Sequence, residues 1–444
     1  MKLWEKGINT DKLIEDFTVG RDRQLDLLLA PYDVLGSIAH ALMLESVNLL
    51  TPNETTQLHQ ALVDIYHSIE NGGFEIESGV EDVHSQVELL LTRKLGDTGK
   101  KIHSARSRND QVLLDLKLFS RAKIHQLSGE VSHLFQQLQV LSQQHKNILL
   151  PGYTHLQVAM PSSFGLWFGA YAESLTDDMQ MLLASYKLVN QNPLGSAAGY
   201  GSSFPINRQM TTRLLGFEQL NYNVVYAQMG RGKVERNVAW ALGNLASTIS
   251  RMAYDLCLFM SQNFGFVTLP DEFTTGSSIM PHKKNPDVFE LLRAKCNKVQ
   301  ALAYELSLVS NNLPSGYFRD MQIIKESYLE AFEYLIECVQ VASFILPKLK
   351  VNENILDKEI YRYLFSVEEV NREVLRGTPF RDAYKKIGES INNGTFKSDA
   401  QVQHTHEGSI GNLCNTEIRA KFEHIFAQFD FDIAIRAEQK LLQL

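Results

Sequence analysis

The chain has 444 residues, a formal net charge of −8 at pH 7 and a pI near 5.9. Because this length is well beyond the usual size of one compact core, we expect two or three domains or one very elongated unit. The acidic balance gives no support for a general nucleic-acid or membrane surface, so small molecules are the expected partners.

The cysteines and the N-terminus both favour a cytoplasmic location. Residues 1–6 show no basic stretch followed by an apolar run, and no later segment approaches the roughly 18 uninterrupted apolar residues of a membrane span. The cysteines lie far apart without C-x-x-C spacing, which is typical of buried thiols in a reducing compartment. They are Cys257, Cys296, Cys338 and Cys414.

Long helices are the main structural expectation. No proline occurs between Pro52 and Pro151 or between Pro205 and Pro270, which leaves room for helices far above the usual length. Apolar residues at alternating steps of three and four predict helices around 124–141, 164–182, 234–259, 289–309 and 329–346. Helices of about 30 residues span ~45 Å each, so together they predict an elongated bundle. Apolar residues off the main stripes, such as Trp167 and Trp240, favour oligomerisation.

Strand signals are sparse, and 221–226 is the one persuasive candidate. We therefore expect an all-α fold, in which a central long-helix bundle is flanked by two smaller, mostly helical domains. The boundaries follow the polar segments between helices. They predict an N-terminal domain over 1–106, a central bundle over 107–347 and a C-terminal domain over 348–444.

The first polar segment with chemical potential, 102–111, stands directly before an apolar helix. Ser107 or Asp110 could be simple N-caps, and arginines are common in surface loops. Against that interpretation, Arg108 and Asn109 are donors concentrated at a helix N-terminus, which suits a dicarboxylate.

The second segment, 151–157, separates two long helices. A lone histidine in a turn is more often a capping or surface residue than a catalytic one. His155 nevertheless follows Thr154 and precedes the amide of Gln157, and histidine exchanges protons near neutral pH.

The third segment, 276–286, joins a Gly-Ser-Ser loop, two lysines and a helix start. The loop can present N–H groups to an anion, and Lys283 adds positive charge. Asn285 before Pro286 predicts an N-cap and first turn, with the helix dipole aimed at the loop. Such a site favours a carboxylate and can stabilise the alkoxide of Ser277. Glu290, in the first helical turn, could orient a histidine or merely complement the dipole.

A fourth segment, 315–325, places Tyr317, Arg319 and Gln322 between two helices, where a polar interhelical turn is the simpler interpretation. Two other patterns carry no site. The Gly-rich run 195–201 lacks the order of a phosphate loop. His404 and His406 have no carboxylate or cysteine partner at convincing spacing, so we expect a structural role and no metal site.

Taken in order, these segments resemble the argininosuccinate lyases of the fumarase/aspartase superfamily over nearly the whole chain. Residues 276–286 match G-S-S-x-M-P-x-K-x-N-P, the loop shared by the superfamily. The more specific support is H-S-A-R-S-R-N-D-Q at 103–111, G-Y-T-H-L-Q at 152–157, K-K-N-P-D at 283–287 and P-F-R-D-A at 379–383.

The resemblance implies cofactor-free cleavage of argininosuccinate to fumarate and arginine, in a homotetramer whose active sites each draw residues from three subunits. It implies that Ser277 abstracts the Cβ proton, that Lys283 and the loop amides stabilise the aci-carboxylate, and that His155, with Glu290, protonates the leaving nitrogen. The implied substrate-binding residues are Ser107, Arg108, Asn109, Thr154, Gln157, Asn285, Tyr317, Arg319 and Gln322.

Some positions depart from the family pattern. The segment 18–23 lacks a Ser-x-Ser pattern, Arg319 stands where Lys is common, Ile324 replaces an acid, and Tyr384 stands where His often follows P-F-R. An adenylosuccinate lyase would need a purine and phosphate pocket, for which we find no segment. A non-catalytic, crystallin-like protein is the alternative of another class, and the presence of Ser277, His155 and Lys283 argues against it.

Overall fold

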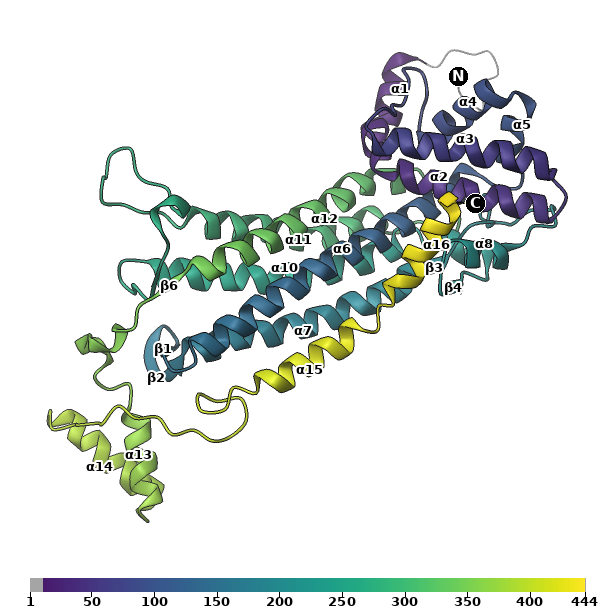
Figure 1. Cartoon of the computed structure of the whole chain (residues 1–444). Helices are drawn as coiled ribbons and strands as arrows, with labels where there is room; N and C mark the ends of the chain where they lie inside the picture. The colour runs from purple at the N-terminus through teal and green to yellow at the C-terminus, as the bar shows by residue number, and fades with distance from the viewer. Residues whose placement is uncertain (1–10, 444) are drawn as a thin grey trace.

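The computed structural model describes residues 11–443, which form an elongated, almost entirely helical molecule (Figure 1). The helices of the central bundle run side by side over most of its length. They are α6 (Arg108–Gln144), α7 (Phe164–Val189), α10 (Lys233–Met260), α11 (Asp287–Val309) and α12 (Asp320–Ile345). Each contains one of the predicted apolar stripes, so the all-α prediction and all these helix predictions are confirmed.

A single large core holds the bundle together. The stripe residues of α6, among them Leu127, Val131 and Leu134, are fully buried against α7 and α12. Ser107 is the N-cap of α6, and Asp110 completes a capping box by accepting the Ser107 N–H at 2.8 Å. With 37 residues, α6 is about 55 Å long, so one continuous helix connects the two ends of the molecule.

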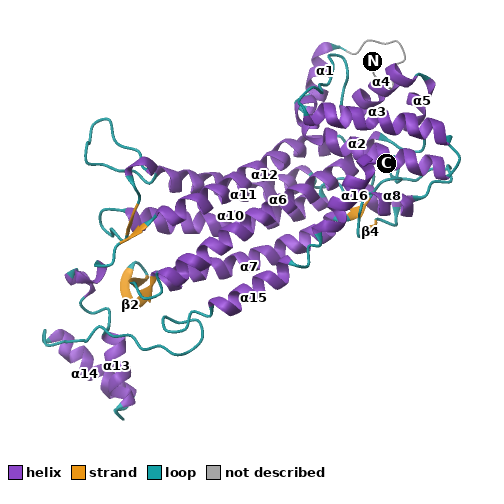
Figure 2. Ribbon diagram, viewed as in Figure 1, coloured by secondary structure: helices purple, strands orange, loops and turns teal. Residues whose placement is uncertain are grey.

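The N-terminal lobe lies at one end of the bundle and has a second apolar core (Figure 2). Its helices are α1 (Lys12–Val19), α2 (Asp22–Ser46), α3 (Pro52–Glu70), α4 (Val83–Leu95) and α5 (Asp97–Lys100). By length and composition α2 could cross a membrane, with a mean hydropathy of 1.6 over 18 residues, but 72% of that window is buried inside the protein. Its apolar character is therefore accounted for by core packing.

The C-terminal segment first leaves the bundle and then returns along it (Figure 1). Helices α13 (Ser366–Leu375) and α14 (Phe380–Asn392) lie at the far end, whereas α15 (Asn415–Phe426) and α16 (Phe431–Gln443) run back toward the N-terminal lobe. Phe422 stacks on Phe135 with ring centroids 4.0 Å apart, and Glu438 pairs with the buried Arg121 at 2.8 Å. The three domain boundaries remain a prediction.

Short strands and turns connect the helices. The strands are β1 (Leu149–Thr154), β2 (Gln157–Ser163), β3 (Gln191–Asn192), β4 (Gln219–Leu220), β5 (Val267–Thr268) and β6 (Lys350–Val351), and the remaining short helices are α8 (Arg208–Leu214) and α9 (Val224–Met229). The strand predicted at 221–226 is wrong, because α9 begins there. Asn223 caps that helix by accepting the Tyr226 N–H at 3.0 Å. Val224 and Val225 are β-branched and favoured a strand, whereas Asn223 as an N-cap residue correctly indicates the start of a helix.

The cysteines are free thiols throughout the described residues. Cys296 and Cys338 are buried as expected, whereas Cys257 and Cys414 are half-buried. Of the two histidines expected to be structural, His404 contacts Ser409 at 2.7 Å and Glu368 at 3.2 Å, so it does have a carboxylate neighbour that the sequence spacing did not reveal.

Candidate functional site

The loop that carries Ser277 projects from the far end of the bundle. The N–H of Asn285 donates to the Thr275 carbonyl at 2.9 Å, and this isolated bridge closes the loop at its base. The next helix, α11, begins at Asp287 with Pro286 as its N-cap residue, so the prediction that Asn285 is the N-cap is wrong. Asn285 is used in the bridge to Thr275, and among the described residues no side chain caps the start of α11 by a hydrogen bond.

Within this loop the Ser277 hydroxyl already has backbone donors. Its Oγ accepts the N–H groups of Ile279 at 3.3 Å and Met280 at 3.0 Å. Lys283 is exposed, and Lys284 pairs with Asp271 at the base of the loop. Two amides aimed at one hydroxyl oxygen would also stabilise the corresponding alkoxide, which is the arrangement that a serine base requires.

His155 lies at the tip of the β1–β2 hairpin. Thr154 pairs with Gln157 across a two-residue turn, in which His155 and Leu156 have φ values of 54° and 58°. This is the left-handed geometry of a tight hairpin turn, which normally selects glycine or asparagine. Neither residue is of that kind, so the turn is strained, and strain of this kind concentrates at functional sites. His155 is exposed there with Thr154 and Gln157.

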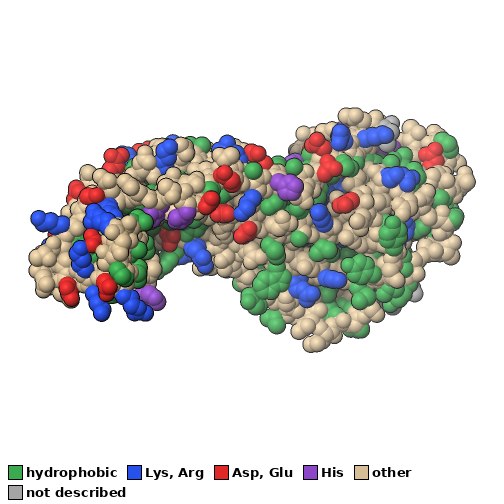
Figure 3. Space-filling model, turned by 90° about the horizontal axis from the view of Figure 1, so that it is seen from below, with side chains coloured by type: hydrophobic (Ala, Val, Ile, Leu, Met, Phe, Trp, Pro, Cys, Tyr) green, Lys and Arg blue, Asp and Glu red, His purple; other side chains and the backbone are tan. Residues whose placement is uncertain are grey.

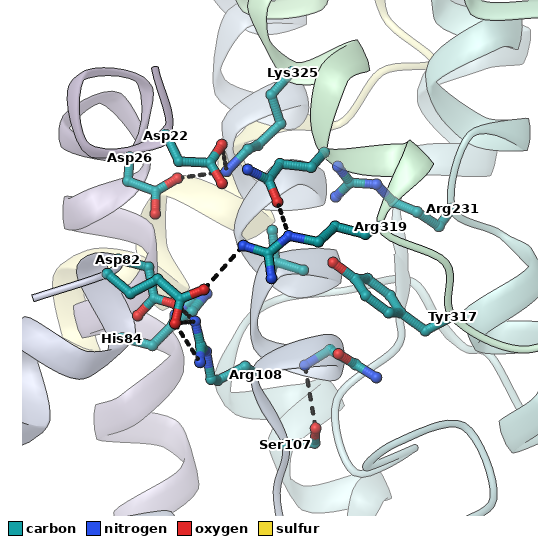
Figure 4. Close-up of a pocket in the computed structure, with 14 residues that line it drawn as sticks. Asp22, Asp26, Asp82, His84, Ser107, Arg108, Arg231, Tyr317, Arg319 and Lys325 are labelled. Carbon is teal, nitrogen blue, oxygen red and sulfur yellow. Dashed lines mark hydrogen bonds and ion pairs between the residues drawn. The ribbon is translucent and has the colours of Figure 1, made fainter. Parts of the chain in front are cut away.

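A separate pocket lies where the N-terminal lobe meets the bundle (Figure 4). Its volume is about 270 Å³. From the predicted set it brings together Ser107, Arg108, Asn109, Tyr317, Arg319 and Gln322. It does not include Ser277, His155, Lys283, Glu290, Thr154, Gln157 or Asn285.

The start of α6 is firmly positioned at this pocket. Besides closing the capping box, Asp110 accepts the N–H groups of Gly195 and Ala197, both at 2.9 Å. Burial raises the pKa of Asp110 to about 6. Backbone N–H groups of the Gly-rich run therefore bind a carboxylate of the protein itself.

On the opposite wall, the start of α12 binds the N-terminal segment. Arg319 donates to the Thr18 carbonyl at 2.9 Å and to Gln322 at 3.0 Å, and Gln322 donates to the same Thr18 carbonyl at 2.8 Å. Arg319 therefore uses several nitrogens of its planar fork at once, which a lysine could not do. Residues 18–23 and Arg319 both depart from the family pattern, and Arg319 binds this segment through the Thr18 carbonyl.

Sequence reasoning missed several charged residues of the pocket. Lys325 lies between Asp22 at 2.6 Å and Asp26 at 2.8 Å, and all three are largely buried. Burial raises the pKa of Asp22 to about 6, although Lys325 opposes that shift. Arg231, also in the lining, is buried. Lys325 stood within the fourth polar segment, whereas Arg231 gave no signal beyond the glycines on either side of it.

His84, also missed, connects the pocket to a buried acidic pair. Its Nδ1 lies 2.7 Å from Asp33 and 3.7 Å from Asp115. Burial opposes the charged imidazolium, but Asp33 and Asp115 outweigh it and raise the pKa of His84 to about 9. One ligand atom from each of these residues lies within 4.8 Å of the others, as a metal site would need. Burial and the neighbouring Asp33 raise the pKa of Asp115 well above its ordinary value, so this buried acid favours its neutral form.

The two groups of predicted residues lie at opposite ends of the protomer (Figure 1). Arg231, at the pocket, precedes α10, and the Ser277 loop follows that helix. The 28 residues of α10 separate the two by about 42 Å. One subunit therefore does not place Ser277 or His155 in the pocket that holds Arg319.

The family comparison covers most of the chain. A family model described as a lyase matches residues 4–301. A protein from Bacteroides fragilis named argininosuccinate lyase is 66% identical over 441 residues, which is 99% of both chains. Another of that name, from Thermotoga neapolitana, is 37% identical over 87% of this chain and 98% of its own.

Solved structures share the fold at low identity. A variant of EDDS lyase with bound fumarate has a TM-score of 0.76 at 20% identity, covering 99% of this chain and 95% of its own. A class II fumarase from Schistosoma mansoni has a TM-score of 0.73 at 16% identity, covering 94% of each chain. The helical fold of these lyases is therefore the fold of this protein, and by its sequence the chain belongs to the argininosuccinate lyase family.

Proposed function

We propose that this protein is an argininosuccinate lyase, which splits argininosuccinate into fumarate and L-arginine without a cofactor. The observation that carries the proposal is the full-length similarity to proteins of that name, at 66% identity over 441 residues. On the same similarity we propose that the enzyme acts in the cytoplasm, as part of arginine biosynthesis.

The proposed chemistry is an elimination. Ser277 takes the Cβ proton next to a carboxylate, and the electron pair left on carbon expels the guanidino nitrogen as the double bond of fumarate forms. His155, oriented by Glu290, gives that nitrogen a proton. A proton of this kind is very weakly acidic, so the charge that develops on the carboxylate needs preorganised donors. In this proposal Lys283 and amides of the same loop supply these donors.

We further propose that the active site is composite and that the protein is a homotetramer. About 42 Å of α10 separates the Ser277 loop from the pocket, so a complete site requires loops from other subunits. Ser107, Arg108, Asn109, Tyr317, Arg319 and Gln322 would bind substrate from one subunit. Thr154, Gln157 and Asn285 would bind it from others.

The exposed surface of the bundle supports self-association. Leu291, Tyr304 and Leu308 on α11 are 61%, 64% and 74% exposed. Trp240 on α10 packs edge-on against Tyr304 and is itself exposed. Hydrophobic side chains also gather in patches on the face seen in Figure 3. Large apolar side chains exposed together mark an interaction surface, and association with a second copy of the bundle would cover them.

The test is fumarate release from the purified protein, followed by ultraviolet absorbance, with adenylosuccinate, malate and aspartate as parallel substrates. We expect turnover of argininosuccinate alone. Turnover of another substrate instead would keep the superfamily chemistry and overturn the specificity. No turnover of any of the four by a folded oligomer would favour the crystallin-like alternative.

A further inference from the structure

Glu81 joins the two arginines of the pocket. It lies just before α4, and its side chain is 11% exposed. One carboxylate oxygen is 3.1 Å from Arg108 Nη2, and the other is 3.0 Å from Arg319 Nη2. Arg108 belongs to α6 and Arg319 precedes α12, so a single carboxylate bridges two separate walls of the site.

The other charges of the pocket are matched in the same way. Arg108 also pairs with Asp82, and Lys325 pairs with Asp22 and Asp26. The lining thus balances acids against bases; the acids are Asp22, Asp26, Glu81 and Asp82, and the bases are Arg108, Arg231, Arg319 and Lys325, with His84 in addition. A ligand carboxylate that binds the Nη2 atoms of Arg108 and Arg319 replaces Glu81 there.

This replacement discriminates between ligands. If a simple dicarboxylate such as fumarate takes Arg108 or Arg319, Glu81 loses its partners and remains as a poorly solvated charge, which is costly. A ligand that also carries a cation can take both sides of the pair: its carboxylate binds an arginine, and its cation binds Glu81. After this exchange both Glu81 and the arginine still have a partner of opposite charge.

We propose that Glu81 is a specificity-determining residue that receives a cationic group of the substrate and selects against plain dicarboxylates. The inference rests on the proposed function and deepens it, because argininosuccinate carries an ammonium and a guanidinium group as well as carboxylates. Fumarate, the product, carries carboxylates only. Glu81 would therefore hold the substrate and favour release of this product.

The surrounding loop keeps Glu81 in place while leaving its charge open to substitution. Arg23 donates to the Val80 carbonyl at 2.7 Å, and the Val80 N–H donates to the Glu77 carbonyl at 3.0 Å. Asp82 caps α4 by accepting the Ser85 N–H at 2.9 Å. Removing the charge of Asp82 would disturb that helix start, so Glu81 is the residue to change.

The experiment compares Glu81→Gln with wild type in two assays. The first is steady-state cleavage of argininosuccinate. The second is calorimetric binding of fumarate and of argininosuccinate, the latter with Ser277→Ala in the background to prevent turnover. We expect KM for argininosuccinate to rise about tenfold with kcat little changed, since one charged contact is lost, and fumarate to bind several-fold more tightly.

The matched control is Glu77→Gln. Glu77 belongs to the same loop but pairs with Arg93, outside this pocket, so both affinities should stay at the wild-type level. Glu81→Asp keeps the charge and should recover part of the preference for argininosuccinate. This recovery, together with the opposite changes for the two ligands, is a signature that a purely structural role would not produce.

Two outcomes would overturn the proposal. One is a parallel loss of affinity for both ligands, which would make Glu81 a scaffold residue. The other is no change in either. The calorimetric arm keeps the two proposals separable: a wild-type protein that turns over no argininosuccinate contradicts the proposed function, whereas the relative affinities still decide the role of Glu81.

Discussion

The pocket at one end of the protomer and the loops at the other end differ in how firmly their polar side chains are held. At the pocket, Arg319, Arg108 and Lys325 are all held by carboxylates or carbonyls of the chain itself. At the far end, His155 stands exposed on a strained turn and Lys283 on an exposed loop. The pocket is therefore preorganised within one subunit, whereas the far end presents exposed side chains, as the composite site that we propose would require.

The largest expected effect comes from the exposed end. Ser277→Ala should lower kcat by about 10³-fold, because it removes the group that we propose takes the Cβ proton. Thermal unfolding should stay near wild type, since among the described residues the hydrogen bonds of Ser277 Oγ lie within its own exposed loop. Full turnover by a folded variant would contradict the assignment of Ser277 as the base.

Mixing variants from the two ends tests whether the halves meet across subunits. Ser277→Ala and Arg319→Ala should each be nearly inactive alone. After joint unfolding and refolding, hybrid oligomers should regain activity well above either parent, because some sites then combine two intact halves. If the mixture stays as inactive as its parents while sizing as one oligomer, each site is built within a single subunit.

At the preorganised end, Lys325→Met should lower the free energy of unfolding by about 3 to 5 kcal/mol, because it leaves Asp22 and Asp26 buried without their cation. Denaturant titration measures this loss. Lys283→Met, at the exposed end, is the control and should leave the unfolding midpoint unchanged. Equal stability of both variants would show that the two ends do not differ in this respect.

His84 should make the preorganised end sensitive to alkaline pH. Its folded pKa of about 9 lies above the ordinary value of 6.5, so its stabilising contribution is complete below pH 6.5 and is lost as the pH rises through 9. Wild type should therefore lose stability over this window, and His84→Gln should lose less. Identical pH profiles of the unfolding midpoint would show that the cluster of Asp33, His84 and Asp115 does not titrate there.

The smallest effect is expected from the cap of α6. Ser107→Ala should cost about 1 kcal/mol of unfolding free energy, because the N-terminal amides of α6 lose an acceptor. If Ser107 also binds substrate, KM for argininosuccinate should rise in the same variant. Ser163→Ala, which removes the equivalent cap of α7, is the matched control and should leave KM unchanged.

Local patterns in the chain predicted much of the molecule. The apolar stripes of α6 and α10 predict long helices, because apolar residues spaced by three and four positions favour one buried helical face along the whole segment. Ser107 correctly predicted the start of α6. Gly276, Ser277 and Ser278 correctly predicted an exposed loop. The prediction failed where local signals competed. Val224 and Val225 favoured a strand, but Asn223 is the N-cap of a helix. Asn285 was the expected N-cap of α11, but it forms a bridge with Thr275 instead.

The sequence by itself determined the helical class, the family and the identity of the polar segments, because these depend on neighbours within a few positions. Only the tertiary structure decided how the segments are grouped. Lys325 meets Asp26 across 299 positions, and Glu81 meets Arg319 across 238, so no spacing rule could reveal either pair. The rigid length of α6 and α10 then keeps Ser277 and His155 away from that pocket, since a straight helix holds its two ends apart.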